Sequence, residues 1–187
     1  MTATALLTFE EYLAYDDGTD NHYELVDGRL ERMNPPTIAH LLIARFLEQT
    51  LQQEIQRLSL PWVALREAGV RTGPRKSRLM DVCVVTQQQA RELQNESAIF
   101  QTPPLLAIEI VSPESVKRDY RYKRSEYAAL EIPEYWIVDP LAIQISLLVL
   151  EEGLYEERVL DETQLITSPT FPEIDLTVAQ ILAASQL

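Results

Sequence analysis

Near the N-terminus, two short patterns of apolar and polar residues predict a helix followed by a β-hairpin. Residues 8–11, TFEE, have the Thr-x-x-Glu spacing of a capping box, which predicts a helix starting at Thr8. Residues 22–33, HYELVDGRLERM, alternate between apolar and polar on both sides of Asp27-Gly28, a pair that suits a two-residue type I′ turn. We therefore expect a short helix and then a hairpin.

A long helix is predicted after Pro35-Pro36, from Thr37 to about Leu58. Thr37 is a good N-cap residue, and inward-facing residues recur after it at spacings of three and four. These residues are His40, Ala44, Leu47, Leu51, Ile55 and Leu58. One helical face therefore packs against a sheet, and His40 lies on that face.

The rest of the chain alternates between apolar runs and polar or charged helical segments. We expect strands at 62–66, 79–85, 105–111, 135–139, 143–150 and 155–160, helices at 87–94, 115–130 and 177–184, and a basic loop, GPRKSR, at 73–78. Residues 135–150 are expected to form a second antiparallel hairpin. This order predicts an α/β fold with a central mixed sheet flanked by helices.

Length and composition are consistent with one folded domain, residues 1–187. The apolar fraction of 46% is enough for a substantial core. No run of about 18 apolar residues occurs, and residues 1–12 lack the basic region of a secretory signal, so we expect no membrane span and a cytoplasmic location. The single cysteine, Cys83, lies in an apolar strand and is expected to be a buried core residue.

The net charge of −13 opposes general attraction to nucleic acid, yet the basic residues are unevenly distributed. Ten of the 16 lie in two short segments: Arg66, Arg71, Arg75, Lys76 and Arg78, then Lys117, Arg118, Arg121, Lys123 and Arg124. The first segment precedes Asp81 and the second follows Glu109. Each is either a solvated face or a surface for a nucleic-acid backbone.

Glu109 is the one carboxylate inside the apolar run LLAIEIVSP, residues 105–113. Burying an unpaired carboxylate costs several kcal/mol, roughly, so this acid needs a cation or a proton. Asp81 begins another apolar strand 28 positions earlier. If the two strands are neighbours, both acids can emerge on the same side, and two such ligands plus water suit Mg²⁺ or Mn²⁺. Alternatively, Asp81 caps a strand end and Glu109 pairs with an arginine.

Several segments together resemble the Uma-type family of restriction endonuclease-like proteins, a branch of the PD-(D/E)XK nuclease superfamily. The segments, in order, are YELVDGRLERM, AHLLIARFL, RLMDVCVV, LLAIEIVSPES, DYRYKRSEYAAL and EYWIVDP. The resemblance runs from about Thr8 to Leu182. It implies a restriction-endonuclease-like core with extra β-hairpins and a metal-dependent site that cleaves phosphodiester bonds in DNA.

The resemblance also implies which residues form that site. Asp81 corresponds to the aspartate of the Pro-Asp motif, and Glu109 to the acid of the (Asp/Glu)-x-Lys motif. Met80 replaces the motif proline and Val111 replaces the motif lysine. In the Uma-type pattern, an Asp-x-x-x-Lys sequence on the following helix supplies the missing cation.

Asp119 and Lys123 match that helical pattern, and Tyr127 lies one turn further along. The alternative for Asp119 and Lys123 is an ordinary surface pair. His40 is expected to support the site or to act as a base for the attacking water, or else to be a core histidine. Glu24 is expected to be a third carboxylate for the metal, or else a solvated hairpin residue.

DNA is the expected partner, with contacts from six basic residues: Arg75, Lys76, Arg78, Lys117, Arg118 and Arg121. One alternative keeps the fold without the activity, as a nucleic-acid-binding or regulatory domain. Another is a protein-interaction module that forms a homodimer through residues 143–150, IQISLLVL, whose weak alternation predicts a strand covered by a partner's edge.

Overall fold

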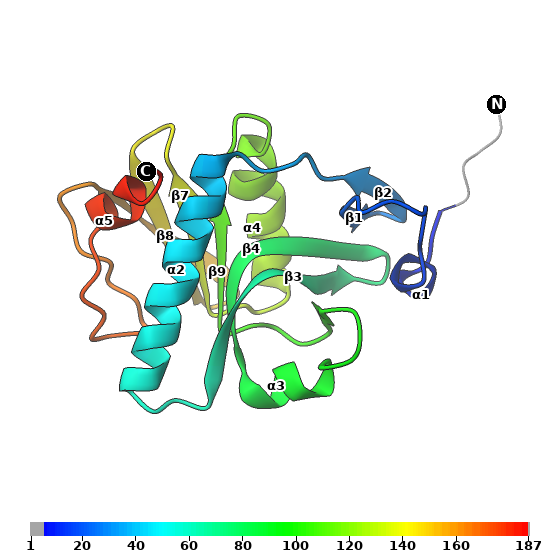
Figure 1. The fold of residues 1–187 in the computed structure, drawn as a ribbon, viewed down its shortest axis with the longest axis horizontal. Coiled ribbons are helices and arrows are strands. Elements are labelled where there is room, and N and C mark those ends of the chain that lie inside the picture. Colours follow the sequence, from blue (N-terminus) through cyan, green and yellow to red (C-terminus); the bar gives the residue numbers. More distant parts are fainter. Residues whose placement is uncertain (1–5, 187) are drawn as a thin grey trace.

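A computed structural model describes residues 6–186, which form a mixed sheet with helices on both faces (Figure 1). The strands are β1 (Tyr23–Val26), β2 (Arg29–Arg32), β3 (Trp62–Gly73), β4 (Lys76–Thr86), β5 (Ile99–Phe100), β6 (Leu106–Ile110), β7 (Glu134–Asp139), β8 (Gln144–Glu151) and β9 (Leu154–Asp161). The helices are α1 (Phe9–Leu13), α2 (Ile38–Arg57), α3 (Gln87–Glu92), the π-helix η1 (Arg118–Lys123), α4 (Arg124–Ala129) and α5 (Val178–Ala183). The predicted fold class is confirmed.

Local capping and turn signals are confirmed. Thr8 and Glu11 form the predicted capping box at α1, and the Thr37 hydroxyl accepts a hydrogen bond from the backbone N–H of His40 at the start of α2. Asp27 and Gly28 both have positive φ, 49° and 81°, as a type I′ turn requires. No helix within residues 6–186 is long and apolar enough to cross a lipid bilayer.

The β3–β4 hairpin is much longer than predicted and projects from the body of the sheet toward β1 and α1 (Figure 1). Gly73 pairs directly with Lys76, so only Pro74-Arg75 form the turn. The predicted basic loop at 73–78 is therefore wrong, because its second half is already strand. The backbone of β4 pairs with β3 through residues 76–78, where the basic side chains give no strand signal in the sequence.

On the other side of the sheet, β6 and β7 are parallel, whereas β7, β8 and β9 are antiparallel neighbours. The second predicted hairpin, β7–β8, is therefore confirmed. The idea that β8 is covered by a partner's edge is wrong, since β8 lies between β7 and β9 of its own chain. Its weak alternation reflects burial on both faces by this chain's own residues.

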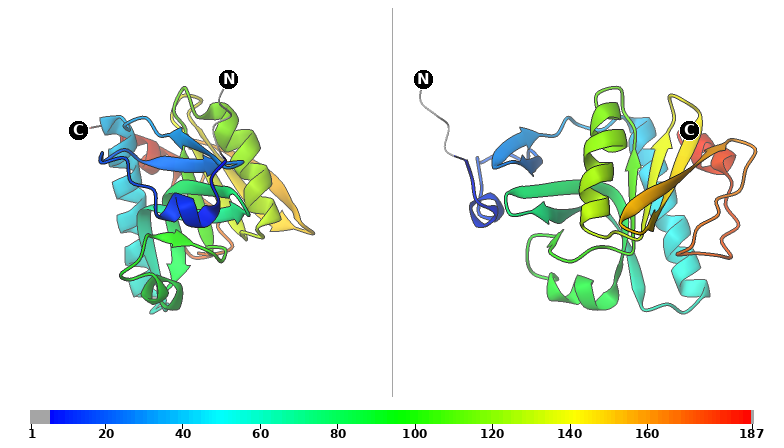
Figure 2. Two further views of the ribbon diagram at one scale, coloured as in Figure 1. Left: turned by 90° about the vertical axis from the view of Figure 1, so that its right-hand side faces the viewer. Right: turned by 180° about the vertical axis from the view of Figure 1, so that it is seen from behind.

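Two hydrophobic layers hold the helices to the sheet. On one face, α2 packs Ile43, Leu47 and Leu51 against strand residues such as Val82. On the other face, Tyr127 of α4 packs against the sheet. The right view of Figure 2 shows α4 in front of the sheet on this face. Cys83 belongs to this second layer: its side chain is fully buried, and burial raises its pKa to about 12, so it is an unreactive core thiol.

Strand β4 changes partners along its length, and this change creates an opening in the sheet. Its outer part pairs with β1 at Ser77, whereas its inner part pairs with β6 from Val82 onward. Residues 78–81 lie between the two pairings. The backbone groups of β4 that face this opening need other partners.

Candidate active site

Side chains from three other elements fill the opening beside β4. The backbone N–H of Leu79 donates to Glu24 Oε1 of β1 at 3.1 Å, and its carbonyl accepts from Lys123 Nζ of η1 at 2.6 Å. Lys123 and Glu24 thus replace the missing ladder partner of Leu79. The local fold of β4 and the position of these two charged groups depend on each other.

Asp81 and Glu109 come from the neighbouring strands β4 and β6, as predicted. The Asp81 carboxylate accepts from the backbone N–H of Ile110 at 2.7 Å, and its other oxygen lies 3.1 Å from His40 Nε2. Because Ile110 follows Glu109 directly, this contact ties Asp81 to the end of the strand that carries the second acid. His40 reaches the opening from α2.

Lys123 is the cation that pairs with the buried Glu109 carboxylate. Glu109 is 2% exposed, and its Oε2 lies 2.7 Å from Lys123 Nζ, while its Oε1 accepts from the Tyr127 hydroxyl at 2.7 Å. Lys123 is 1% exposed and also lies 3.3 Å from Glu24 Oε1. Lys123 is therefore not part of a surface pair, and the cation beside Glu109 is a lysine rather than an arginine.

Burial and charge act against each other in this cluster. Burial raises the pKa of Glu109 well above its usual range, although the Lys123 ammonium opposes that shift. Burial also disfavours a charged Lys123, but Glu109 and Glu24 outweigh it and raise the lysine pKa. For Glu24, burial is again outweighed, here by Lys123 and Arg78, so its pKa is lowered. Glu24 and Lys123 are thus a stable ion pair at neutral pH.

The pKa of His40 is also raised. Burial disfavours the imidazolium, but the hydrogen bond and negative charge of Asp81 outweigh that effect. His40 is partly buried near the start of α2, and its Nε2 lies 3.1 Å from the Asp81 carboxylate. This contact fits a supporting role better than that of a free base.

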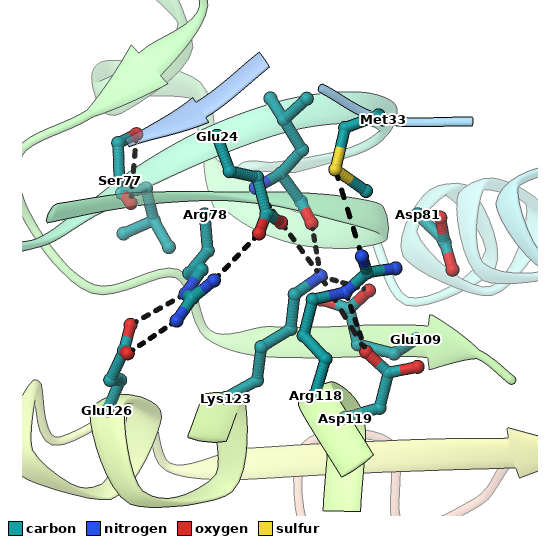
Figure 3. A network of polar contacts seen from close by, with 12 residues as sticks. Glu24, Met33, Ser77, Arg78, Asp81, Glu109, Arg118, Asp119, Lys123 and Glu126 are labelled. Atoms are coloured by element: carbon teal, nitrogen blue, oxygen red, sulfur yellow. Dashed lines mark hydrogen bonds and ion pairs between the residues drawn. The ribbon is translucent and has the colours of Figure 1, made fainter. Parts of the chain in front are cut away.

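Arg78 corrects one sequence prediction. Arg78 is 2% exposed, and its guanidinium bridges two carboxylates (Figure 3). Its Nη1 donates to Glu24 Oε2 at 2.8 Å. Its Nε and Nη2 donate to the two oxygens of Glu126 at 2.8 and 2.7 Å. Its role as a DNA contact is wrong, because its donors face inward. Sequence patterns missed Glu126 entirely, and its only signal was the i,i+3 spacing from Lys123.

Asp119 and Arg118 lie at the edge of the cluster (Figure 3). Asp119 is buried, and its Oδ1 has no hydrogen-bond partner among residues 6–186; Arg118 Nε lies 3.6 Å away and Lys123 Nζ 4.0 Å away. Arg118 Nε is also buried and has no hydrogen-bond partner in the described part of the chain. Burial raises the pKa of Asp119. A carboxylate oxygen left free beside two other acids is a ready acceptor for a bound water or ion.

The other predicted DNA contacts differ in exposure. Arg75, Lys117 and Arg121 are exposed. Lys76 is partly exposed, and its ammonium lies 3.2 Å from Asp27. These four side chains remain accessible to a polyanion, unlike Arg78.

The donor set fits a hard divalent cation held by few protein ligands. Within residues 6–186, no group of three histidine, cysteine or acidic side chains is spaced to hold a metal ion. Asp81 and Glu109 nevertheless supply oxygen ligands from adjacent strands, which with water suit Mg²⁺ or Mn²⁺. Carboxylates outnumber basic side chains here: five acids, Glu24, Asp81, Glu109, Asp119 and Glu126, lie near four bases, Lys76, Arg78, Arg118 and Lys123. Glu24 differs from the other two predicted ligands in that two cations, Arg78 and Lys123, contact its carboxylate, which leaves it less negative charge for a metal ion.

The chain is similar to solved structures and to one family of known proteins. The solved structure of a protein described as a putative nuclease belonging to DUF820, from Anabaena variabilis ATCC 29413, matches with a TM-score of 0.81 over 96% of this chain and 99% of that chain, at 18% identity. The type IIG restriction endonuclease BpuSI matches with a TM-score of 0.41 and 13% identity over 82% of this chain and 17% of its own. No protein with a curated description matches the chain. The model of the family "Uma2: Putative restriction endonuclease" matches residues 9–179. The chain therefore belongs to the Uma2 family.

Proposed function

We propose that the protein is a divalent-metal-dependent endonuclease that hydrolyses phosphodiester bonds in DNA. Family membership supports the reaction class. One observation carries the proposal for this chain: the Lys123 amine lies 2.7 Å from Glu109 in a buried cluster that Asp81 adjoins. Val111 stands where the motif has a lysine, and Lys123 of η1 brings an amine to the Glu109 carboxylate instead.

Asp81 and Glu109 are the residues that would hold Mg²⁺ or Mn²⁺. An ion held by these two residues would supply a positive charge that polarises the phosphate and would lower the pKa of a water molecule. Lys123 stays protonated at neutral pH because the surrounding carboxylates raise its pKa. From its buried position beside Glu109, its positive charge would stabilise the negative charge that develops on the phosphate oxygens in the transition state.

The surrounding groups keep these three side chains in place. Tyr127 donates to the Glu109 oxygen that Lys123 does not contact, so the carboxylate cannot rotate freely. His40 holds one oxygen of Asp81, and Asp119 has a free oxygen for a water molecule. The contacts of Tyr127 and His40 restrict the orientation of Glu109 and Asp81, which lowers the entropic part of the barrier.

Four accessible basic side chains, Arg75, Lys76, Lys117 and Arg121, are proposed to follow the DNA backbone. Phosphate contacts position the duplex and carry no sequence information. Because the protein has a net charge of −13, attraction depends on this local surface and is screened by salt. Binding should therefore weaken steeply as ionic strength rises.

A nuclease-fold domain without activity, serving as a nucleic-acid-binding or regulatory module, is the second candidate. It rests on the strong net negative charge and on Val111 in place of the motif lysine. The buried position of Lys123 beside Glu109 favours the enzyme instead, because a lysine kept for a regulatory surface gains nothing from burial among carboxylates.

A cleavage assay tests the proposal. Plasmid and single-stranded DNA are incubated with wild-type protein, Asp81→Ala and Glu109→Ala in Mg²⁺, Mn²⁺ or EDTA. We expect cleavage by the wild type that needs the divalent ion and is absent from both variants. Cleavage that persists in both variants excludes this site, and no cleavage by the folded wild type favours the inactive domain.

A further inference from the structure

Arg78 and Glu126 form an ion pair next to Glu24, the carboxylate that the proposed catalytic lysine also contacts. Arg78 reaches Glu126 through two of its nitrogens and Glu24 through the third (Figure 3). Glu126 accepts in addition from the Thr72 hydroxyl at 2.8 Å. This network joins four elements, β1, β3, β4 and α4.

The two oxygens of Glu24 are divided between different partners. Arg78 takes Oε2 at 2.8 Å, which leaves Oε1 for the backbone N–H of Leu79 at 3.1 Å and for Lys123 at 3.3 Å. Lys123 lies closer to Glu109, at 2.7 Å. A Glu24 without Arg78 would be free to attract the ammonium with its full charge, and the lysine would move away from Glu109.

We propose that Arg78 and Glu126 are positioning residues that hold Glu24 so that the Lys123 ammonium stays on Glu109. Glu126 fixes the guanidinium by a two-point contact, and Arg78 in turn fixes and partly neutralises Glu24. The inference rests on the proposed function only for its effect on rate. The position of the Lys123 ammonium can be measured without any activity.

The chain supplies a matched control. Arg57 makes the same two-point contact with Glu54, through Nε at 2.9 Å and NH2 at 2.7 Å, but on the exposed side of α2. Arg57→Lys and Glu54→Gln therefore remove a comparable Arg–Glu pair away from the cluster. Arg78→Lys keeps the charge but cannot bridge two carboxylates with a planar fork.

The first readout is the rate of DNA cleavage. Arg78→Lys and Glu126→Gln should lower kcat by roughly 10- to 100-fold, as small misplacements of catalytic groups do, with KM for DNA changed less than about twofold. Arg57→Lys and Glu54→Gln should match the wild type. An equal rise in KM in the Arg78 and Glu126 variants, with kcat retained, would assign the pair to DNA binding and overturn the proposal.

The second readout is the ¹⁵N NMR signal of the Lys123 ammonium, identified by its loss in Lys123→Arg. Its three N–H groups have three acceptors, Leu79 O, Glu109 and Glu24, so slow exchange with water is expected in the wild type. The signal should shift or broaden in Glu126→Gln and Arg78→Lys and stay unchanged in the Arg57 variant. An unchanged Lys123 signal in folded Glu126→Gln overturns the proposal, even if Arg78→Lys does not fold. If the wild type cleaves no DNA, the proposed function fails, and this signal still decides the role of the pair.

Discussion

The Lys123 ammonium lies 2.7 Å from the Glu109 carboxylate, and both side chains are almost completely buried. They come from η1 and β6 and are 14 positions apart in the chain. A buried ion pair is costly to break, because the remaining charge loses its partner without regaining water.

Stability should therefore show strong coupling between these two residues. Lys123→Met alone should lower the free energy of unfolding by about 3–5 kcal/mol, because Glu109 and Glu24 lose their shared cation. The double variant Lys123→Met with Glu109→Gln should be more stable than the sum of the two single changes predicts. Urea denaturation of the four proteins measures the coupling, and strictly additive losses would contradict the buried pair.

Tyr127→Phe should affect the acid that the tyrosine contacts. The hydroxyl donates to Glu109 Oε1 at 2.7 Å, so its removal should cost about 1–3 kcal/mol of stability and weaken Mn²⁺ binding. Tyr155→Phe is the matched control, because that hydroxyl donates to the carbonyl of Ile132 at 2.8 Å, away from the site. Calorimetric titration should show weaker binding only for Tyr127→Phe. Equal affinities in both variants would remove Tyr127 from the site.

The stability of the metal-free protein should depend on pH through His40. Its pKa is raised in the folded state, mainly because Asp81 outweighs the effect of burial. The folded protein thus holds the proton more tightly, so this contribution is complete below about pH 6.5 and is lost as the pH rises through the folded-state pKa. The raised pKa of Glu109 also makes stability fall as the pH rises, starting from lower pH. The difference in stability between wild type and His40→Gln therefore isolates the contribution of the histidine. Thermal melting with EDTA should show this difference shrinking above neutral pH; a constant difference would contradict the contact.

Glu134 should behave as a structural acid, in contrast to Glu109. It lies at the start of β7 and accepts from Trp136 Nε1, Ser168 Oγ and the backbone N–H of Thr170 at 2.6–2.9 Å. In Glu134→Gln, an NH₂ group replaces one accepting oxygen and faces hydrogen-bond donors. The free energy of unfolding should therefore fall by about 1–3 kcal/mol. DNA cleavage at 20 °C should be unchanged. A loss of cleavage without a loss of stability would show that Glu134 belongs to the site.

Local signals in the sequence predicted much of the fold. The capping box at Thr8, the Asp27-Gly28 turn and the helix from Thr37 each depend on a few neighbouring residues, and all three are confirmed. The β3–β4 hairpin was predicted too short, because pairing between two strands stabilises backbone that its own charged residues do not favour. Long-range pairing of this kind leaves little trace in a single sequence.

The site could be predicted only in part, for a related reason. An acid in an apolar strand marks Glu109 on chemical grounds, and the family pattern marks Lys123. Nothing local marks Arg78 as buried, because its partners, Glu24 and Glu126, are 54 and 48 positions away. The π-helical turn at η1 was also missed, since its hydrogen bonds need no particular residue type.

Titration of the protein with Mn²⁺, followed by calorimetry, tests the central claim most directly. The wild type should bind the ion, and Asp81→Asn and Glu109→Gln should each weaken binding at least about tenfold, because each removes one of two charged oxygen ligands. Glu134→Gln, a buried acid outside the site, should bind like the wild type. Absence of binding by the folded wild type, or equal affinity in all four proteins, would contradict a divalent ion held between β4 and β6.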